Sequence, residues 1–160
     1  TTEDAFAIGL SFISIQKQRG LGNEVTVGRD GRLSSPALVA ALIDGLVAGG
    51  AQVSDIGCGP TPMLYYAAHE LGSDGAIQVT GSHNPPTHNG FKMMMGGLSF
   101  FGADIEELGR VSAAGPDRTD DGGVVSQAIE EAYVDRLAAG AVTCARFRGY
   151  SGTRPRTAGA

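Results

Sequence analysis

The stretch EVTVGRDGRLSSPALVAALIDGLVAGGAQVSDIG, residues 24–57, contains two apolar runs with a clearly punctuated segment between them. The run at 24–28 is short and rich in β-branched residues, which predicts a buried strand. Ser35 is the predicted N-cap of a helix, a proline follows it in the first turn, and the glycines at 49–50 lie beyond its end. Residues 51–57 then predict a second strand. The stretch is therefore read as strand, helix, strand.

The same alternation extends over most of the chain. Helices are predicted at 1–20 (with Thr2 as N-cap), 61–71, 103–112 and 126–139, and strands at 75–80 and 91–95. Strands that alternate with helices are typical of an α/β fold with a parallel sheet. The short link between the last two strands also allows an antiparallel hairpin, which favours a mixed sheet. We expect a three-layer α/β domain with a mixed, largely parallel sheet of about four strands between helices.

The composition limits the partners of the chain. Its 160 residues are 42% hydrophobic, enough for one domain with a core, and its net charge of −5 argues against nucleic acid or an anionic membrane as partner. No apolar run approaches the length of a membrane span, and the N-terminus lacks the order of a signal peptide. Cys58 and Cys144 are far apart and outside any CxxC spacing, as expected for reduced thiols. We expect a cytoplasmic protein with no nucleic-acid or membrane partner.

The charges are distributed unevenly along the chain. Residues 145–160 contain four arginines and no acidic residue, whereas all 17 acidic residues precede them. A segment of Arg, Gly, Ser and Pro favours disorder. We therefore predict a folded domain at 1–139 and a basic, disordered tail at 140–160. The alternative, a basic arm that binds nucleic acid, rests on the four arginines alone.

The most unusual connection is TGSHNPPTHNG, residues 80–90, between the last two predicted strands. Gly81 and two prolines should fix the backbone so that the Ser82 hydroxyl is exposed. We do not expect Ser82 and His83 to form a nucleophile–base pair, because neighbours in an extended loop point in opposite directions. Backbone N–H groups in such a bend can bind an anion. Nearby positive charge, which suits phosphoryl transfer, could come from His83, Lys92 and either Arg29 or Arg32. The alternative is a hairpin whose polar side chains only cap backbone groups.

Three polar connections leave the carboxyl ends of predicted strands, at 28–35, 57–62 and 80–90. In parallel sheets these ends meet at one edge, so the connections should gather there. Within the first connection, Arg29 either pairs with Asp30 and braces the start of the helix or binds a phosphate bidentately. The sequence leaves both interpretations open.

Three segments in this order and spacing, VGRDGRLSS, PTPMLYYA and VTGSHNPPTHNGFKM, resemble the first domain of the α-D-phosphohexomutases. The GSHNP and NGFK forms resemble the phosphomannomutase/phosphoglucomutase branch more than the phosphoglucosamine mutases. The resemblance covers about residues 1–139, and the serine loop is its most specific part.

The resemblance implies that the loop presents a phosphoryl carrier. By similarity, Ser82 holds a phosphoryl group in the resting enzyme and gives it to a hexose phosphate. The resulting hexose 1,6-bisphosphate, also the activator, returns its other phosphate to Ser82. Mg²⁺ would be bound partly through the phosphoserine oxygens, which makes Ser82 the implied metal residue as well. Lys92 matches a family lysine that assists proton transfer or binds charge. His83 and Asn84 match the loop that shapes the site, and Arg29 would belong to the phosphate environment.

The chain also departs from the family pattern. Family members are much longer, and their aspartate-rich metal loop, sugar-recognition loop and distal phosphate loop lie in later domains. A YDIRG-like first strand is missing, and His88 stands where the loop often has a tyrosine. We interpret the chain as domain I, truncated at both ends, of an intramolecular phosphotransferase. Its expected partners are glucose or mannose phosphate and the missing domains, and we expect it to be inactive alone. The alternatives are a non-catalytic folded fragment that keeps the serine loop, and a phosphoglucosamine mutase domain.

Overall fold

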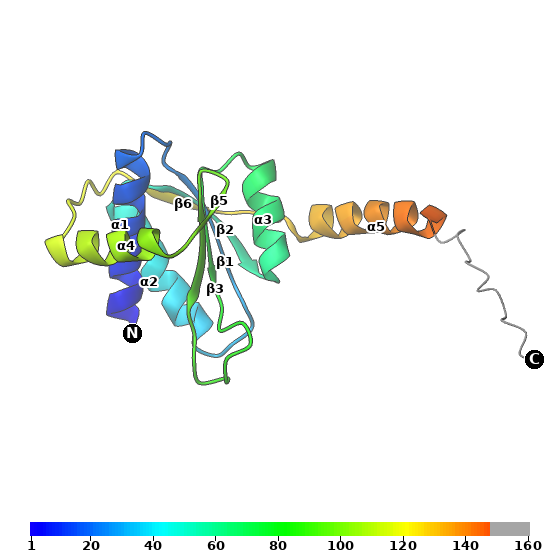
Figure 1. The fold of residues 1–160 in the computed structure, drawn as a ribbon, viewed down its shortest axis with the longest axis horizontal. Helices are drawn as coiled ribbons and strands as arrows, with labels where there is room; N and C mark the ends of the chain where they lie inside the picture. The colour runs from blue at the N-terminus through cyan, green and yellow to red at the C-terminus, as the bar shows by residue number, and fades with distance from the viewer. Residues whose placement is uncertain (148–160) are drawn as a thin grey trace, which may run out of the picture. The chain divides into compact units, whose positions relative to one another are not determined.

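The computed structural model describes residues 1–147, with side chains as far as residue 140. The elements are α1 (Thr2–Gln18), β1 (Glu24–Arg29), α2 (Ser35–Ala48), β2 (Gln52–Cys58), α3 (Thr61–Glu70), β3 (Gly75–Val79), β4 (Phe91–Met95), β5 (Leu98–Phe100), α4 (Ala103–Ala114), β6 (Gly123–Ser126) and α5 (Glu130–Phe147) (Figure 1). Thr1–Ile129 form one compact unit, and α5 belongs to a second.

The strands of the first unit form a six-stranded sheet in the order β5-β4-β3-β1-β2-β6. Three neighbouring pairs are parallel, namely β3–β1, β1–β2 and β2–β6. The other two pairs are antiparallel, because β4 runs opposite to both β3 and β5. The predicted mixed, largely parallel sheet is confirmed, including the hairpin at its antiparallel side. The predicted strand count of about four was low. Strands β5 and β6 are only three and four residues long, which is too short for a recognisable pattern.

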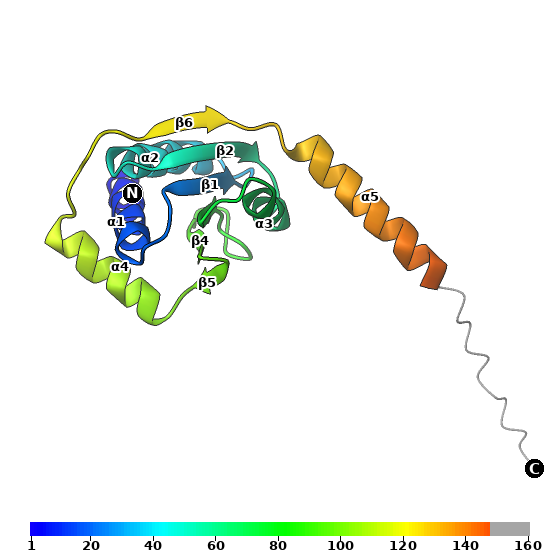
Figure 2. The ribbon, with the colours of Figure 1, turned by 90° about the horizontal axis from the view of Figure 1, so that it is seen from above.

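Helices cover both faces of the sheet, as Figures 1 and 2 show, with α1, α2 and α4 on one face and α3 on the other. This follows from the strand order. The chain moves from β1 through α2 to β2 in one direction, and from β2 through α3 past β1 to β3 in the other. Right-handed crossovers in opposite directions place their helices on opposite faces. The predicted three-layer arrangement is therefore confirmed.

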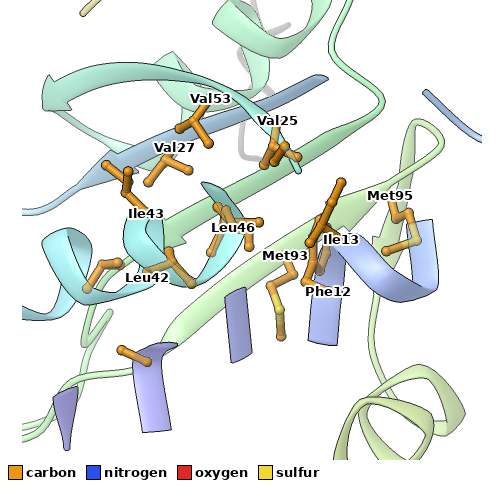
Figure 3. Packing of buried hydrophobic residues seen from close by; sticks show 14 of the residues in the cluster. Phe12, Ile13, Val25, Val27, Leu42, Ile43, Leu46, Val53, Met93 and Met95 are labelled. Atoms are coloured by element: carbon orange, nitrogen blue, oxygen red, sulfur yellow. The ribbon is translucent and has the colours of Figure 1, made fainter. Parts of the chain in front are cut away.

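The core lies between the sheet and the layer of α1 and α2, and it is mainly aliphatic (Figure 3). Alternate residues of β1 and β4 point into it, so Val25 and Val27 are fully buried and Met93 and Met95 nearly so. The residues between them face the other way; the Thr26 hydroxyl, for example, lies 2.7 Å from that of Ser73. The period-2 pattern of these strands therefore separates the core face from the α3 face.

Two predicted helix caps differ from the structure by one residue. Thr1, not Thr2, caps α1: its hydroxyl accepts from the Asp4 N–H, and the Asp4 carboxylate accepts from Thr1 in return. At α2 the N-cap is Ser34, with no side-chain capping bond, and Ser35 is the first helical residue. The Ser35 hydroxyl instead donates to the carboxylate of Asp30, in the loop before α2.

Helix α5 differs from its predicted bounds at both ends. It begins at Glu130 rather than at 126, because residues 123–126 form β6. It continues to Phe147, although the sequence predicted a helix end at 139 and a tail from 140. Gly140 costs a helix only about 1 kcal/mol relative to alanine, so it did not end this one. Residues 148–160 of the predicted tail lie outside the described residues. Within the described part of the chain, no helix combines the length and apolar character of a membrane span.

Candidate active site

The connections that follow β1, β2 and β3 meet at the carboxyl edge of the sheet, as the sequence predicted. The Asp30 N–H donates to the Val79 carbonyl and the Gly59 N–H to the Arg29 carbonyl, both at 2.9 Å. The buried Gln78 side chain reaches from β3 to the Gly59 carbonyl, with an Nε2–O distance of 2.9 Å. These bonds join the ends of the three strands into one rim.

Ser82 is exposed on this rim and has a left-handed backbone, with φ of 51°. This conformation costs an L-residue roughly 1–2 kcal/mol. Two local hydrogen bonds support it. The Ser82 N–H donates to Thr80 Oγ1 (3.0 Å), and the Asn84 N–H donates to the Gly81 carbonyl (2.9 Å). A strained residue on an exposed loop is a candidate for function, because such strain persists only where the surroundings enforce it.

The Ser82 hydroxyl lies beside the His83 imidazole. Ser82 Oγ and His83 Nδ1 are 3.3 Å apart, and both residues are exposed. The expectation that these side chains point in opposite directions is therefore wrong. That argument assumed an extended loop, whereas the chain turns at Ser82. The contact is long for a hydrogen bond, but it gives the hydroxyl a neighbour that can accept or donate a proton.

The carboxylate of Asp30 connects the first loop to the serine loop. It accepts the Gly81 N–H (3.2 Å), the Arg32 N–H and Nε (both 3.1 Å) and the Ser35 hydroxyl (2.5 Å). Partial burial disfavours the Asp30 charge. The hydrogen bonds from Ser35, Arg32 and Gly81 outweigh it and hold the pKa of Asp30 below its ordinary value. Asp30 is therefore an ionised acceptor that fixes the start of the serine loop.

The Arg32 guanidinium binds the far side of the same loop. Nη1 donates to two loop carbonyls and Nη2 to two others, while Nε donates to Asp30. The four carbonyl acceptors are Pro85 (2.6 Å), His88 (3.0 Å), Ser82 (3.1 Å) and Asn84 (2.8 Å). The Arg32 side chain is only 17% exposed. The guanidinium is thus mostly covered by the loop whose carbonyls it binds, as expected of a support for that loop.

Arg29 lies at the end of β1, on the same rim, and its pairing with the Asp30 carboxylate, one of the two interpretations that the sequence left open, is not found. Its Nη1 donates to the Asp30 carbonyl at 3.2 Å, and the carboxylate pairs with Arg32 instead. Among the described residues, no carboxylate lies within ion-pair distance of the Arg29 guanidinium. The interpretation of Arg29 as a phosphate ligand stays a prediction.

Lys92 is exposed on β4, directly opposite Gln78 of β3. Its neighbour Met93 packs into the core, so the Lys92 side chain belongs to the opposite, α3, face of the sheet. No acidic side chain within the described residues forms an ion pair with it. Its charge is available to an anionic ligand on that face.

The other loop residues have less direct parts in the site. Asn84 is exposed, and its main chain is bonded on both sides, to Gly81 and to Arg32. His88 Nδ1 lies 3.1 Å from the hydroxyl of Thr87. Asn89, which the sequence did not single out, donates through Nδ2 to the hydroxyls of Ser34 (3.0 Å) and Ser35 (2.8 Å). These bonds fasten the end of the serine loop to the start of α2.

Residues 1–115 match the phosphoglucomutase/phosphomannomutase family, alpha/beta/alpha domain I. The chain belongs to this family. The matched residues of this domain I include α1 to α4 and the whole serine loop, so the predicted resemblance to the phosphohexomutases is confirmed.

Relatives of this domain I support the same assignment. A phosphomannomutase/phosphoglucomutase of Pseudomonas aeruginosa is 50% identical over 108 residues, and a phosphoglucomutase of Neisseria gonorrhoeae is 44% identical over 109 residues. Each match covers 68% of this chain but only 23% of the relative. A crystal structure of a phosphoglucomutase/phosphomannomutase family protein from Burkholderia thailandensis aligns with a TM-score of 0.79 at 40% identity, over 87% of this chain and 32% of that one.

A Mg²⁺ site, which the family implies, is not completed by the residues of this domain I. Within the part of the chain that the structure describes, no three His, Cys, Asp or Glu side chains come together to hold a metal. Asp30, the acid bonded to the serine loop, already accepts four hydrogen bonds. Mg²⁺ requires near-octahedral coordination by hard oxygens. A phosphate on Ser82 would supply part of that set and no more.

The sequence did not indicate the part that Arg32 and Asn89 have in holding the serine loop. Four of the five acceptors of the Arg32 guanidinium are backbone carbonyls, which every residue has, so they leave no trace in the sequence. The spacing of the two arginines in GRDGR is the one available signal, and it does not say which arginine turns inward.

Proposed function

We propose that this chain is the phosphoserine-bearing domain of a sugar-phosphate mutase, with Ser82 as the phosphoryl carrier. The observation that carries the proposal is the Ser82 geometry: an exposed hydroxyl on a left-handed backbone, in a loop that side chains of the first connection hold in place. Membership of the phosphoglucomutase/phosphomannomutase family supports this assignment.

In the proposed reaction, phosphorylated Ser82 gives its phosphoryl group to the free 6-hydroxyl of a hexose 1-phosphate. The bond between Ser82 Oγ and phosphorus breaks and a bond between phosphorus and the sugar oxygen forms. The sugar hydroxyl loses its proton, and the Ser82 oxygen gains one to become a hydroxyl again, so the step balances. The hexose 1,6-bisphosphate then turns over and returns its 1-phosphate to Ser82, which leaves hexose 6-phosphate. Glucose or mannose phosphate is the proposed substrate, because the relatives are named for these mutases.

The neighbours of Ser82 have defined parts in this proposal. The His83 imidazole, 3.3 Å from Oγ, exchanges a proton with the serine oxygen as the phosphoryl group leaves or arrives. Lys92 and Arg29 neutralise phosphoryl charge, and Asn84 shapes the loop around it. Bound Mg²⁺ would add charge neutralisation at the phosphoryl oxygens, with most of its ligands outside this domain.

Phosphoryl acceptance by Ser82 is the direct test. The purified chain is incubated with glucose 1,6-bisphosphate and Mg²⁺, and its intact mass is measured before and after. We expect the mass of one phosphoryl group to be added, peptide mapping to place it on Ser82, and Ser82→Ala to gain nothing. A phosphate mapped elsewhere would overturn the assignment. So would its absence from Ser82 both in this chain and in a chain joined to the other domains.

We further propose that this chain alone does not turn over as a mutase. A transfer stabilised by charge and positioning loses several orders of magnitude in rate when the metal ligands and the grip on the second phosphate are absent. The check is a coupled assay with glucose 1-phosphate or mannose 1-phosphate, Mg²⁺ and a bisphosphate activator. Sustained turnover that Ser82→Ala abolishes would contradict this proposal. A preference of the longer protein for glucosamine phosphate would favour the phosphoglucosamine mutase alternative.

A further inference from the structure

Four carbonyl groups of the serine loop converge on one point, and the Arg32 guanidinium occupies it. A guanidinium has five N–H donors in a rigid plane. In Arg32 each of the five has a distinct acceptor: the four carbonyls of Ser82, Asn84, Pro85 and His88, and the Asp30 carboxylate. The group is therefore fully used, and no N–H remains for a phosphate.

Converging carbonyl oxygens repel one another unless a cation lies between them. A planar fork with five donors meets this requirement, whereas a lysine ammonium has three donors and no fixed plane. The Arg32 side chain is only 17% exposed, so water cannot easily reach the loop carbonyls and replace the hydrogen bonds that they accept from the guanidinium. The loop conformation therefore depends on an arginine at this position rather than on positive charge alone.

Ser82 is held by this arrangement from both sides. The Gly81 N–H immediately before it donates to Asp30, and the Ser82 carbonyl accepts from Arg32. Gly81 also packs directly against the guanidinium, since a Cβ built on it would lie 2.3 Å from Arg32 Cζ. The two bonds on either side of the Ser82 Cα fix its left-handed backbone.

We propose that Arg32 is a positioning residue for Ser82: it holds the serine loop in the conformation that exposes the hydroxyl, and it does not itself bind the transferred phosphate. The conformational part of this inference stands on the hydrogen bonds alone. Its consequence for phosphoryl transfer rests on the proposed function.

The conformational part is tested by NMR and hydrogen exchange of the full chain. In the wild type, the Arg32 Nη protons should give resolved, slowly exchanging signals. In Arg32→Lys, the amide signals of the bonded loop residues Gly81, Ser82, Asn84 and His88 should shift, and their exchange should be at least about tenfold faster, as expected for the loss of several charge-assisted bonds. The matched control is Arg110→Lys, an exposed arginine of α4, which should leave the loop signals unchanged.

Chemical rescue distinguishes the planar donor geometry of a guanidinium from its positive charge alone. Arg32→Ala should regain the wild-type loop signals on addition of guanidinium ion at concentrations that do not denature it, whereas ammonium ion should have no effect. Loop signals that are unchanged in Arg32→Lys would overturn the inference. Freely exchanging Nη protons in the wild type would also overturn it, whether or not the variants fold.

Phosphorylation by glucose 1,6-bisphosphate gives a second readout. We expect Arg32→Lys to accept phosphate on Ser82 at least about tenfold more slowly than the wild type, and guanidinium to restore the rate in Arg32→Ala. If Ser82 accepts no phosphate either in this chain or in a chain joined to the other domains, the proposed function fails while the NMR result still decides the role of Arg32. If Arg32→Lys accepts phosphate at the wild-type rate, the positioning inference fails while the proposed function stands.

Discussion

Two polar loops of this molecule contain the same unusual backbone but are held by different means. The serine loop, residues 80–90, has Ser82 at φ 51°, and the loop at 115–122 has Asp120 at φ 54°. The serine loop is fastened by the side chains of Asp30 and Arg32. The second loop is fastened by its main chain, because the N–H groups of Thr119 and Asp120 both donate to the Ala48 carbonyl at the end of α2.

The difference shows that backbone strain alone does not identify a site. In the second loop the polar side chains pair with one another: Arg118 binds Asp120, and the Thr119 hydroxyl donates to Asp121. The strained residue there belongs to a segment that closes the end of a helix. In the serine loop the polar groups of other segments fix the backbone, and the hydroxyl of the strained residue stays exposed beside an imidazole. Of the two loops, only the serine loop leaves a reactive group exposed on its strained residue.

The largest expected difference between the loops comes from their glycines. A Cβ on Gly122 would lie 2.5 Å from the Val47 carbonyl and 2.6 Å from that of Ala51, both backbone atoms, whereas a Cβ on Gly81 would meet the guanidinium of Arg32, a side chain that can shift if it gives up some of its bonds to the loop. We expect Gly122→Ala to lower the free energy of unfolding by about 3 kcal/mol and Gly81→Ala by about 1 kcal/mol. Urea denaturation measures both.

The rate of Ser82 phosphorylation should respond to the two glycine substitutions in the reverse order. Gly81→Ala should slow phosphorylation of Ser82 strongly, and Gly122→Ala should leave it nearly unchanged in the folded chain. Gly109→Ala is the control, since nothing lies near its Cβ position on α4, and helix propensity should stabilise it by up to about 1 kcal/mol. A larger stability loss for Gly81→Ala than for Gly122→Ala would contradict the contrast between side-chain and main-chain support.

Acid should weaken the serine loop through Asp30. Its folded-state pKa is lowered, so its ionisation stabilises the fold above the ordinary aspartate pKa, and this contribution is lost as the pH falls through the lowered value. At neutral pH we expect Asp30→Asn to cost about 2 kcal/mol, because charged hydrogen bonds to Arg32, Ser35 and Gly81 are weakened. The stability difference from the wild type should shrink in acid.

Asp121 provides the comparison in the second loop. The Thr119 hydroxyl lowers the pKa of this carboxyl too, so the direction of its pH dependence is the same. It is fully exposed, so Asp121→Asn should change stability much less than Asp30→Asn at every pH. Stability curves against pH for the two variants check this, and equal effects would argue against Asp30 as the anchor of the serine loop.

Much of the fold could be predicted from the sequence, because strand and helix periods and their punctuation are local signals. The stripe along α2, the glycines after it and the alternation in β1 each indicate their own element. Strand β6 could not be predicted in this way, since Val124 and Val125 are about half exposed at the sheet edge and show no buried face. It is defined by pairing with β2, a contact distant in sequence.

The central residue of the site, Ser82, could be predicted from the sequence, but the side chains that hold its loop could not. Ser82 stood out because glycine and prolines surround a serine in an otherwise apolar region. The contact with His83 was missed because nothing in the sequence requires a serine to be left-handed, and φ at this position depends on bonds from Asp30 and Arg32. A local pattern can indicate which residue is presented, but the conformation that presents it is set by contacts between segments.

The smallest expected effect concerns the strain itself. Glycine adopts positive φ freely, so Ser82→Gly and Asp120→Gly should each be more stable than the alanine variant at the same position, by about 1 kcal/mol. Glycine and alanine both lack the original side chain, so the loss of its contacts cancels in the difference between the two variants. At residue 120 the lost contact is the exposed Arg118–Asp120 pair, which contributes little in any case. Thermal or urea unfolding of the four variants gives the two differences. Equal values would mean that both loops store the same strain despite their different supports. No difference at residue 82 would mean that the serine is not left-handed in solution, and the argument for an enforced, outward hydroxyl would lose its basis.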